Sequence, residues 1–171
     1  MDRGVNITDH IVWVGVNDYE THLFEALWPL PKGISYNAYL VRDEKVALVD
    51  TVKEAFIGEL LSKIDRHAGG RPLDYIVVNH MEPDHSGAVA VLRRLYPEMT
   101  IVGNAKTAEF LKEFFGVTEG IHVVADGDTL SLGEHTLQFH LTPMVHWPET
   151  MMTYATPGKV LFSGDAFGGF G

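Results

Sequence analysis

The sequence predicts an α/β fold built around a mixed β-sheet. Strand and helix patterns alternate over the first part of the 171 residues, and short strand patterns follow one another over the rest. No internal repeat, low-complexity tract or linker interrupts this order. Alternating strands and helices followed by consecutive strands are typical of layered α/β folds, and the length allows one domain with a sizeable core.

The first elements are predicted to be strands. A β-branched run at residues 11–16 predicts a short strand. Two apolar runs follow at residues 35–41 and 45–49, and the polar segment 42–44 separates them. This arrangement is typical of a β-hairpin.

Helices and strands then alternate. Apolar side chains recur with helical spacing over residues 53–67, and Gly69 follows as a stop signal. Residues 74–78 predict a buried strand, and residues 86–95 predict a helix that ends before Pro97.

The remainder predicts one more helix among strands. Residues 99–102 predict a strand, and Asn104 and Gly116 are the expected N-cap and stop signal of a helix over residues 105–115. A meander of strands is expected afterwards, at residues 121–124, 129–132, 136–141, 151–155 and 159–162.

Composition narrows the functional classes. Twenty-three Asp and Glu residues oppose thirteen Lys and Arg, a net charge of −10, so we expect no nucleic-acid partner, because phosphate binding needs an excess of basic side chains. The lack of cysteine excludes disulfides, Fe–S clusters and a thiol nucleophile. No apolar run approaches the roughly 18–20 residues of a membrane span. The N-terminal segment lacks a signal-peptide pattern, so a cytoplasmic protein is the default expectation.

Four potential metal ligands lie in the loop after the strand at 74–78. The loop has the sequence NHMEPDHSG, residues 79–87. His80 and Glu82 point the same way in extended backbone, whereas Asp84 and His85 follow the proline at the entry to the next helix. Such a loop offers two pairs of ligands to two neighbouring metals. In the alternative, structural interpretation Asp84 is a helix N-cap and His80 a core histidine, but the clustering of all four residues disfavours it.

Two further candidate ligands follow later strand patterns. His146 lies in TPMVHWP, residues 142–148, and Asp165 lies in FSGDAFG, residues 162–168. Each is an ordinary loop residue when considered alone. However, α/β folds gather functional side chains at the carboxyl ends of strands, so we expect both residues to join the loop at 79–87.

The order of these residues resembles the metallo-β-lactamase superfamily, and within it the diiron domain of flavodiiron proteins. Four stretches between positions 33 and 168 carry the resemblance: GISYNAYL, NHMEPDHSGA, TPMVHWPETMMTY and LFSGDAFG. Zinc hydrolases of the superfamily have His where Glu82 stands. Mixed carboxylate and imidazole ligands favour iron or manganese over nitrogen-rich zinc binding. The resemblance implies an αββα sandwich, of which residues 1–171 form the N-terminal portion.

The resemblance also implies a diiron centre. One iron would bind His80, Glu82 and His146, the second would bind Asp84 and His85, and Asp165 would bridge the two. The family takes one more His ligand from a downstream loop and carries FMN in a C-terminal flavodoxin-like domain. We therefore expect the 171 residues to be a fragment or a split gene product, with FMN supplied by missing sequence or by another chain.

The implied activity is reduction of dioxygen to water, of nitric oxide to nitrous oxide, or of both. Electrons would arrive through FMN from an external donor such as a rubredoxin or a flavin reductase. Relatives form head-to-tail homodimers that place the FMN of one subunit beside the diiron site of the other. Two alternatives stay open: a dinuclear hydrolase that uses a metal-bound hydroxide, and an inactive or merely metal-binding half-domain.

Five other residues carry expectations of their own. His22 either lines the pocket near the metals or lies exposed, and Trp147 either walls that pocket or packs in the core. Asp50 either orients a metal-binding histidine or ends its strand in a turn. His135 and His140 share a strand face without a carboxylate partner, and we predict that neither binds metal.

Overall fold

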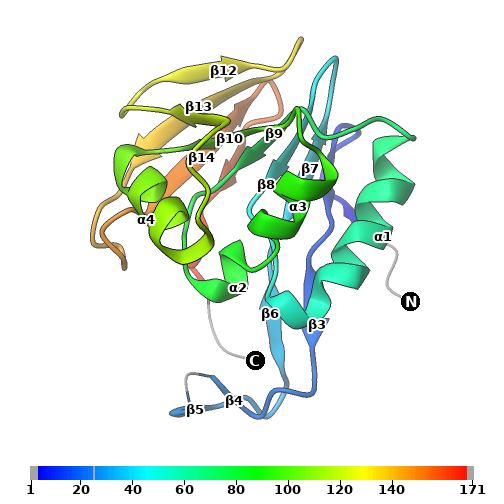
Figure 1. Cartoon of the computed structure of the whole chain (residues 1–171). Coiled ribbons are helices and arrows are strands. Elements are labelled where there is room, and N and C mark those ends of the chain that lie inside the picture. Colours follow the sequence, from blue (N-terminus) through cyan, green and yellow to red (C-terminus); the bar gives the residue numbers. More distant parts are fainter. Residues whose placement is uncertain (1–3, 25, 169–171) are drawn as a thin grey trace.

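A seven-stranded mixed sheet forms the centre of the fold (Figure 1). The computed structural model describes residues 4–24 and 26–168. The first four strands in the sheet are antiparallel neighbours and the last four are parallel, which confirms the predicted mixed sheet. In spatial order the strands are β1 (Val5–Asn6), β2 (Ile11–Trp13), β7 (Tyr39–Arg42), β8 (Val46–Val49), β9 (Tyr75–Val77), β10 (Thr100–Gly103) and β11 (Ile121–Val123).

Helices cover one face of this sheet. They are η1 (Glu54–Phe56), α1 (Ile57–Ala68), α3 (Val89–Leu95) and α4 (Ala105–Phe115). Leu60 and Ile64 lie one turn apart on α1, and they join Leu92 and Leu111 in a core cluster with the buried side chains of the sheet. Burial of such residues stabilises the fold by about 1.5–3 kcal/mol each. The helices of the described segments are too short and too polar to span a bilayer.

A second, four-stranded sheet packs on the opposite face of the first. Its strands are β12 (Thr129–Ser131), β13 (Thr136–Leu141), β14 (Met151–Thr156) and β15 (Val160–Phe162), joined as an antiparallel meander. Leu137 and Phe139 alternate with more exposed neighbours on β13 and fill the space between the sheets with Met151 and Val49. The described residues thus form three of the four expected layers, with no helix packed outside the second sheet.

The meander prediction was wrong for its first strand. β11 does not join the second sheet; it pairs in parallel with β10 at the edge of the first. After β10 the chain runs back through α4 and enters β11 parallel to β10. This β–α–β connection is a crossover of the kind that is right-handed in nearly all proteins.

Two runs that predicted single strands are each divided between two sheets. The run at 11–16 breaks between β2 and β3 (Val16–Asp18), and the run at 35–41 breaks between β6 (Ile34–Tyr36) and β7. β3 pairs with β6 in a separate ribbon, beyond which β4 (Leu23–Phe24) and β5 (Trp28–Pro29) form a projecting hairpin (Figure 1). At the first break the backbones lie so close that a Cβ on Gly15 would stand 2.2 Å from the carbonyl oxygen of Tyr36.

The helix predicted at 86–95 is in fact two helices. α2 (Pro83–Ser86) begins at the proline, and α3 begins after Gly87 and Ala88. Proline suits the first helical position because it has no N–H to leave unpaired there. A Cβ on Gly87 would stand 2.7 Å from the amide nitrogen of Glu54, so the glycine permits the close approach at the break. Asp84 and His85 therefore lie on a short helix of their own.

Candidate metal centre

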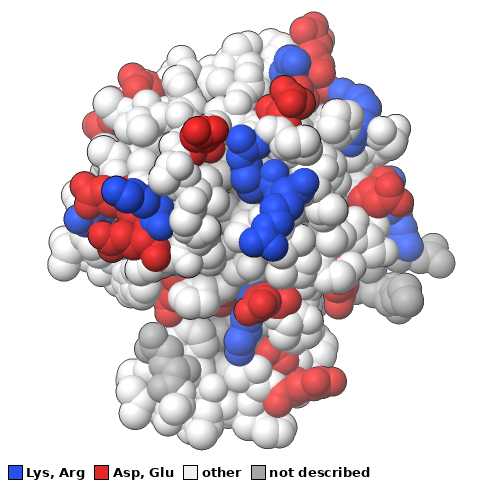
Figure 2. Space-filling model, viewed as in Figure 1, with Lys and Arg blue, Asp and Glu red and all other residues white. Residues whose placement is uncertain are grey.

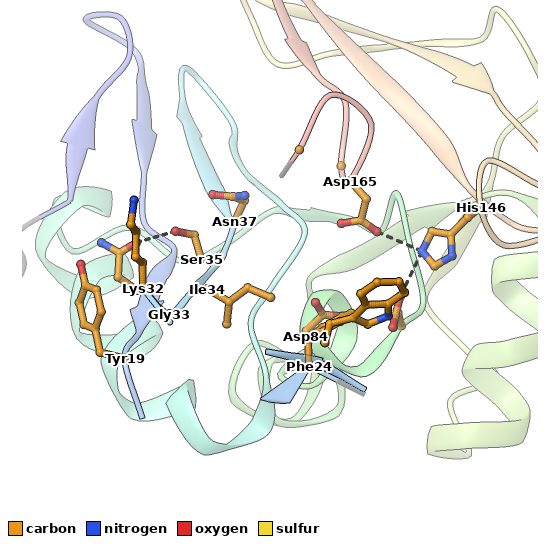
Figure 3. A pocket seen from close by; sticks show the side chains of 15 residues that line it. Tyr19, Phe24, Lys32, Gly33, Ile34, Ser35, Asn37, Asp84, His146 and Asp165 are labelled. Atoms are coloured by element: carbon orange, nitrogen blue, oxygen red, sulfur yellow. Dashed lines mark hydrogen bonds and ion pairs between the residues drawn. The ribbon is translucent and has the colours of Figure 1, made fainter. Parts of the chain in front are cut away.

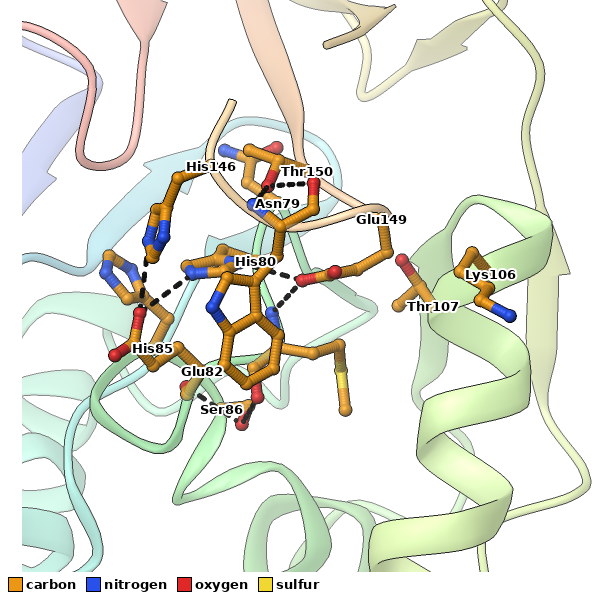
Figure 4. A network of polar contacts seen from close by, with 12 residues as sticks. Asn79, His80, Glu82, His85, Ser86, Lys106, Thr107, His146, Glu149 and Thr150 are labelled. Atoms are coloured by element: carbon orange, nitrogen blue, oxygen red, sulfur yellow. Dashed lines mark hydrogen bonds and ion pairs between the residues drawn. The ribbon is translucent and has the colours of Figure 1, made fainter. Parts of the chain in front are cut away.

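The six predicted ligands come from three loops that meet at one end of the two sheets. His80 and Glu82 follow β9, and α2 carries Asp84 and His85. His146 lies in the loop between β13 and β14, and Asp165 follows β15. Because β9 is parallel to both its neighbours, its carboxyl end opens beside these loops, as is usual for sites in α/β folds. Figure 4 shows His80, Glu82, His85 and His146 turned toward one another.

Four of these residues bring one ligand atom each into a tight cluster. The donor atoms of His80, Glu82, His146 and Asp165 all lie within 4.8 Å of one another. Glu82 Oε2 is 3.1 Å from His80 Nε2 and 3.2 Å from His146 Nε2. His146 Nε2 is also 3.2 Å from Asp165 Oδ2. Two imidazole nitrogens and two carboxylate oxygens converging in this way suit a divalent metal ion.

The carboxylate of Asp165 faces histidines on two sides. Its Oδ2 lies 3.2 Å from His146 Nε2 and 3.7 Å from His80 Nε2, whereas its Oδ1 lies 2.7 Å from His85 Nε2. The backbone of His85 is fixed separately, because Thr51 donates to its carbonyl oxygen from both N–H and hydroxyl. Asp165 therefore belongs to the four-residue cluster through Oδ2 and faces a second position beside His85 through Oδ1.

Asp84 borders that second position. Its Oδ2 is 3.8 Å from His85 Nε2, and its Oδ1 is buried with no hydrogen-bond partner among the described residues. Burial raises the pKa of this carboxyl above its ordinary value. A buried carboxylate oxygen without a partner costs free energy, and a bound cation would remove that cost. The residues present therefore fit a metal ion at this position as well.

Neighbouring carboxylates raise the pKa of two of these histidines, His80 and His85. Burial opposes the charge on His80, but hydrogen bonds to Glu149 and Glu82 raise its pKa to about 10. Burial likewise opposes the charge on His85, and its bond to Asp165 raises that pKa to about 9. For Asp165, burial raises the pKa, but the bond from His85 outweighs it and the pKa falls to about 2. The carboxylates thus create a strongly cation-attracting site.

Glu149 is a residue of this site that the sequence analysis missed. It is fully buried, and its Oε1 accepts hydrogen bonds from His80 Nδ1 at 2.7 Å and from the N–H of Met81 at 2.8 Å. Glu149 lies three residues after His146 in the same loop. The signal that could have found it is the need of a metal-binding imidazole for an acceptor at its second nitrogen.

Asp50, considered for orienting a histidine, instead binds the backbone of the ligand loop. Its Oδ1 accepts from the N–H of Asn79 at 2.8 Å, directly before His80. Burial raises its pKa to about 6, although the neighbouring charges of His85 and His80 lower it. Asp50 therefore fixes the start of the loop rather than an imidazole.

A cavity of about 560 Å³ opens in front of the cluster (Figure 3). Glu82, Asp84, His146 and Asp165 form its inner wall. Its other wall comes from the β3–β6 ribbon and the projecting hairpin, with Asn17, Tyr19, Phe24, Trp28, Lys32, Gly33, Ile34, Ser35 and Asn37. The cavity is large enough for a small molecule to reach the cluster.

His22 and Trp147 lie elsewhere than at this cavity wall. His22 lies at the start of the projecting hairpin, and its side chain is exposed, which is the second of the two positions considered for it. Trp147 is half-buried and packs edge-on against the ring of His80, with centroids 5.2 Å apart, and against Phe110 on α4. The contacts of Trp147 are therefore those of a residue that packs between His80 and α4.

Comparisons with known proteins agree with this geometry. A model of the ODP family of beta-lactamases matches residues 34–171. The nitric oxide reductase of Moorella thermoacetica is 39% identical over 170 residues, which cover 98% of this chain and 43% of that protein. The crystal structure of the flavodiiron protein from Giardia intestinalis matches with a TM-score of 0.91 and 33% identity, over 99% of this chain and 42% of that one.

The rubredoxin oxygen:oxidoreductase of Desulfovibrio gigas also matches. Its TM-score is 0.87 at 36% identity, over 92% of this chain and 40% of that one. These matches confirm the predicted resemblance and fold. The chain spans about two fifths of the length of these proteins.

Proposed function

This chain belongs to the ODP beta-lactamase family, and we propose that it forms the diiron part of an oxidoreductase that reduces dioxygen, nitric oxide or both. The observation that carries the proposal is the position of Glu82, whose carboxylate lies between His80 and His146. A carboxylate at this place makes the donor set rich in oxygen, which favours iron over the zinc of hydrolytic relatives.

The ligands divide between two metal positions. His80, Glu82 and His146 would hold the first iron, and Asp84 and His85 would hold the second. Asp165 would bridge them, which the opposite directions of its two oxygens support. One more ligand to the second iron would come from sequence beyond these residues.

The cavity of about 560 Å³ in front of the cluster gives a small gaseous substrate room to reach the metal positions. A diiron centre bound at its inner wall would supply the electrons that reduce the gas. Phe24, Trp28 and Ile34 contribute apolar and aromatic surface to the opposite wall, and such a wall admits a small, weakly polar molecule. Products would be water from dioxygen and nitrous oxide from nitric oxide. The names of the Moorella and Desulfovibrio relatives support both substrates.

Electrons would reach the metals from FMN bound outside these 171 residues. These residues contain no cysteine for a rubredoxin-type or Fe–S centre, so a flavin and an external donor such as a rubredoxin or a flavin reductase would supply the electrons. The hairpin beside the cavity exposes Leu27 and Trp28 at 73% and 55%, and most of the described residues at the lower left of Figure 2, where the hairpin lies, are uncharged. An apolar surface at this place supports a head-to-tail dimer that brings a flavin close.

Anaerobic gas consumption tests this function. The full-length, iron-loaded protein is mixed with a reduced flavin donor and with dioxygen or nitric oxide in separate reactions. We expect stoichiometric consumption of at least one gas, and the arm with the higher kcat/KM identifies the substrate. An iron-loaded protein that consumes neither gas would contradict the proposal.

A further inference from the structure

We propose that Glu149 is a positioning residue that fixes the imidazole of His80 and strengthens its Nε2 as a metal donor. This inference rests on the proposed diiron function, because it concerns the first of the two iron positions. Carboxylate partners of metal-binding imidazoles fix the ring orientation and raise the basicity of the ligating nitrogen.

The hydrogen bonds around His80 determine which nitrogen is free for a metal. Nδ1 lies 2.7 Å from Glu149 Oε1, so its proton is donated to the carboxylate. Nε2 faces the opposite way, toward Glu82 at 3.1 Å and Asp165 at 3.7 Å (Figure 4). When the proton is held at Nδ1, the lone pair of Nε2 points into the cluster of ligands.

Glu149 itself has little freedom to turn away. Its side chain is fully buried, and the N–H of Met81 donates to the same Oε1 that accepts from His80. Its carbonyl oxygen accepts from Asn104 Nδ2 at 2.6 Å, which ties the loop to the first turn of α4. On the other side of the ring, Trp147 packs edge-on against His80. The imidazole is therefore fixed both by a hydrogen bond and by packing.

His80 differs in this respect from the other two histidines at the site. The Nδ1 of His85 is buried with no hydrogen-bond partner among the described residues. The His146 side chain is 54% exposed, and the polar contacts found for its ring within the described residues are those of Nε2 with Glu82 and Asp165. The buried charge of Glu149 therefore acts on one metal position, that of His80. An anion on the far side of the imidazole favours the more oxidised metal, so it lowers the reduction potential of that iron.

Glu149→Gln tests the inference, with Asp43→Asn as a matched control. Gln can still accept from Nδ1, but it carries no charge. Asp43 likewise accepts from one backbone N–H and one imidazole Nδ1, both of His135, at 2.6 Å and 2.8 Å, and His135 is outside the cluster. In the full-length protein we expect E149Q to bind one of its two irons 10- to 100-fold more weakly and the midpoint potential to become more positive. D43N should leave both quantities unchanged.

Several outcomes separate this inference from the proposed function. If wild-type protein binds two irons and E149Q matches it in both affinity and midpoint potential, Glu149 is not a positioning residue. If E149Q loses both irons equally, the assignment to one position is wrong. If the wild-type protein binds no iron, the proposed function fails instead.

A second measurement needs no variant and no iron. In zinc-substituted wild-type protein with ¹⁵N-labelled histidine, we expect His80 to show a slowly exchanging Nδ1–H and a metal-bound Nε2. An unprotonated Nδ1 on His80 would overturn the inference, even if E149Q fails to fold.

Discussion

At the scale of the residue, the proposed preference for iron depends on one side chain in the loop 79–87. Glu82 Oε2 lies between two imidazole nitrogens, so the proposed first metal position would have a carboxylate where a zinc hydrolase would have a third nitrogen. An anionic oxygen donor stabilises a higher oxidation state better than a neutral imidazole does. The carboxylate of Glu82 is the feature that distinguishes the reductase proposal from the hydrolase alternative.

Glu82→His should therefore shift metal preference from iron toward zinc. We expect the purified variant to contain mainly zinc and to lose gas reduction, because its first position would offer three imidazoles. Metal analysis after growth with equal iron and zinc measures the preference. Retention of iron with full activity would show that Glu82 is not a ligand.

Asp165→Ala should remove the bridge between the two metal positions. Its two oxygens are 2.7 Å from His85 and 3.2 Å from His146, and an alanine offers neither. We expect loss of at least one iron per chain, with the exposed Asp9→Ala as the control that keeps both. A D165A protein that binds two irons tightly would mean that another residue bridges.

The sequence predicts well that these residues meet, because they lie in short motifs at strand ends, where backbone geometry brings them together. Glu149 escapes prediction for a physical reason. Its role depends on a contact with His80 across 69 positions, and its immediate neighbours Pro148 and Thr150 are not metal ligands. A carboxylate that binds a ligand instead of a metal has no local pattern.

At the scale of the element, capping and close backbone approach decide where the site loops begin and end. Asn104 caps α4 as predicted, since its Oδ1 accepts from the N–H groups of Lys106 and Thr107, both at 3.0 Å. The same side chain donates through Nδ2 to the carbonyl oxygen of Glu149. One residue thus ends the loop after β10 and fixes the loop that carries His146.

Asn104→Ala should lower the free energy of unfolding by about 1–2 kcal/mol, because both the cap and a buried hydrogen bond are lost. Urea unfolding followed by tryptophan fluorescence measures the change. Asn104→Asp keeps the capping acceptor but not the Nδ2 donor, so it should lose less. Equal losses in both variants would show that the cap contributes nothing.

The boundaries that the sequence mispredicts are those set by distant backbone. The runs at 11–16 and 35–41 are mostly apolar, and local pattern predicts two continuous strands. The strand predicted at 11–16 is interrupted at Gly15, where the carbonyl oxygen of Tyr36 approaches the backbone. The helix predicted at 86–95 is interrupted at Gly87, where the amide nitrogen of Glu54 approaches. Such contacts are made only after the sheets have assembled, so spacing along the sequence cannot reveal them.

At the scale of the whole molecule, a polar contact joins the two sheets at the end away from the loop that carries His146. Asp43, in the β7–β8 turn, accepts from the N–H and Nδ1 of His135, in the turn before β13. Burial raises the pKa of Asp43, but these bonds from His135 outweigh it and lower the pKa to about 2, from an ordinary 3.8. His135, predicted not to bind metal, thus acts as the partner of a carboxylate.

This contact predicts a pH dependence of stability. Because the pKa of Asp43 is lower in the folded than in the unfolded chain, its contribution is complete above about pH 4 and is lost as the pH falls toward 2. We expect Asp43→Asn to cost about 1 kcal/mol at pH 7, since solvent at the turn weakens the interaction, and progressively less below pH 4. Urea unfolding across this range checks it. A difference between variant and wild type that stays constant with pH would contradict the assignment.

In the proposed function, the three loops at one end of the two sheets hold two irons. Metal analysis of the full-length protein, purified anaerobically after growth with both iron and zinc, measures this. We expect two irons per chain, with Mössbauer spectra of a coupled pair. Two zincs per chain would contradict it and favour the hydrolase, and a folded protein without metal would mean that the ligand cluster binds none.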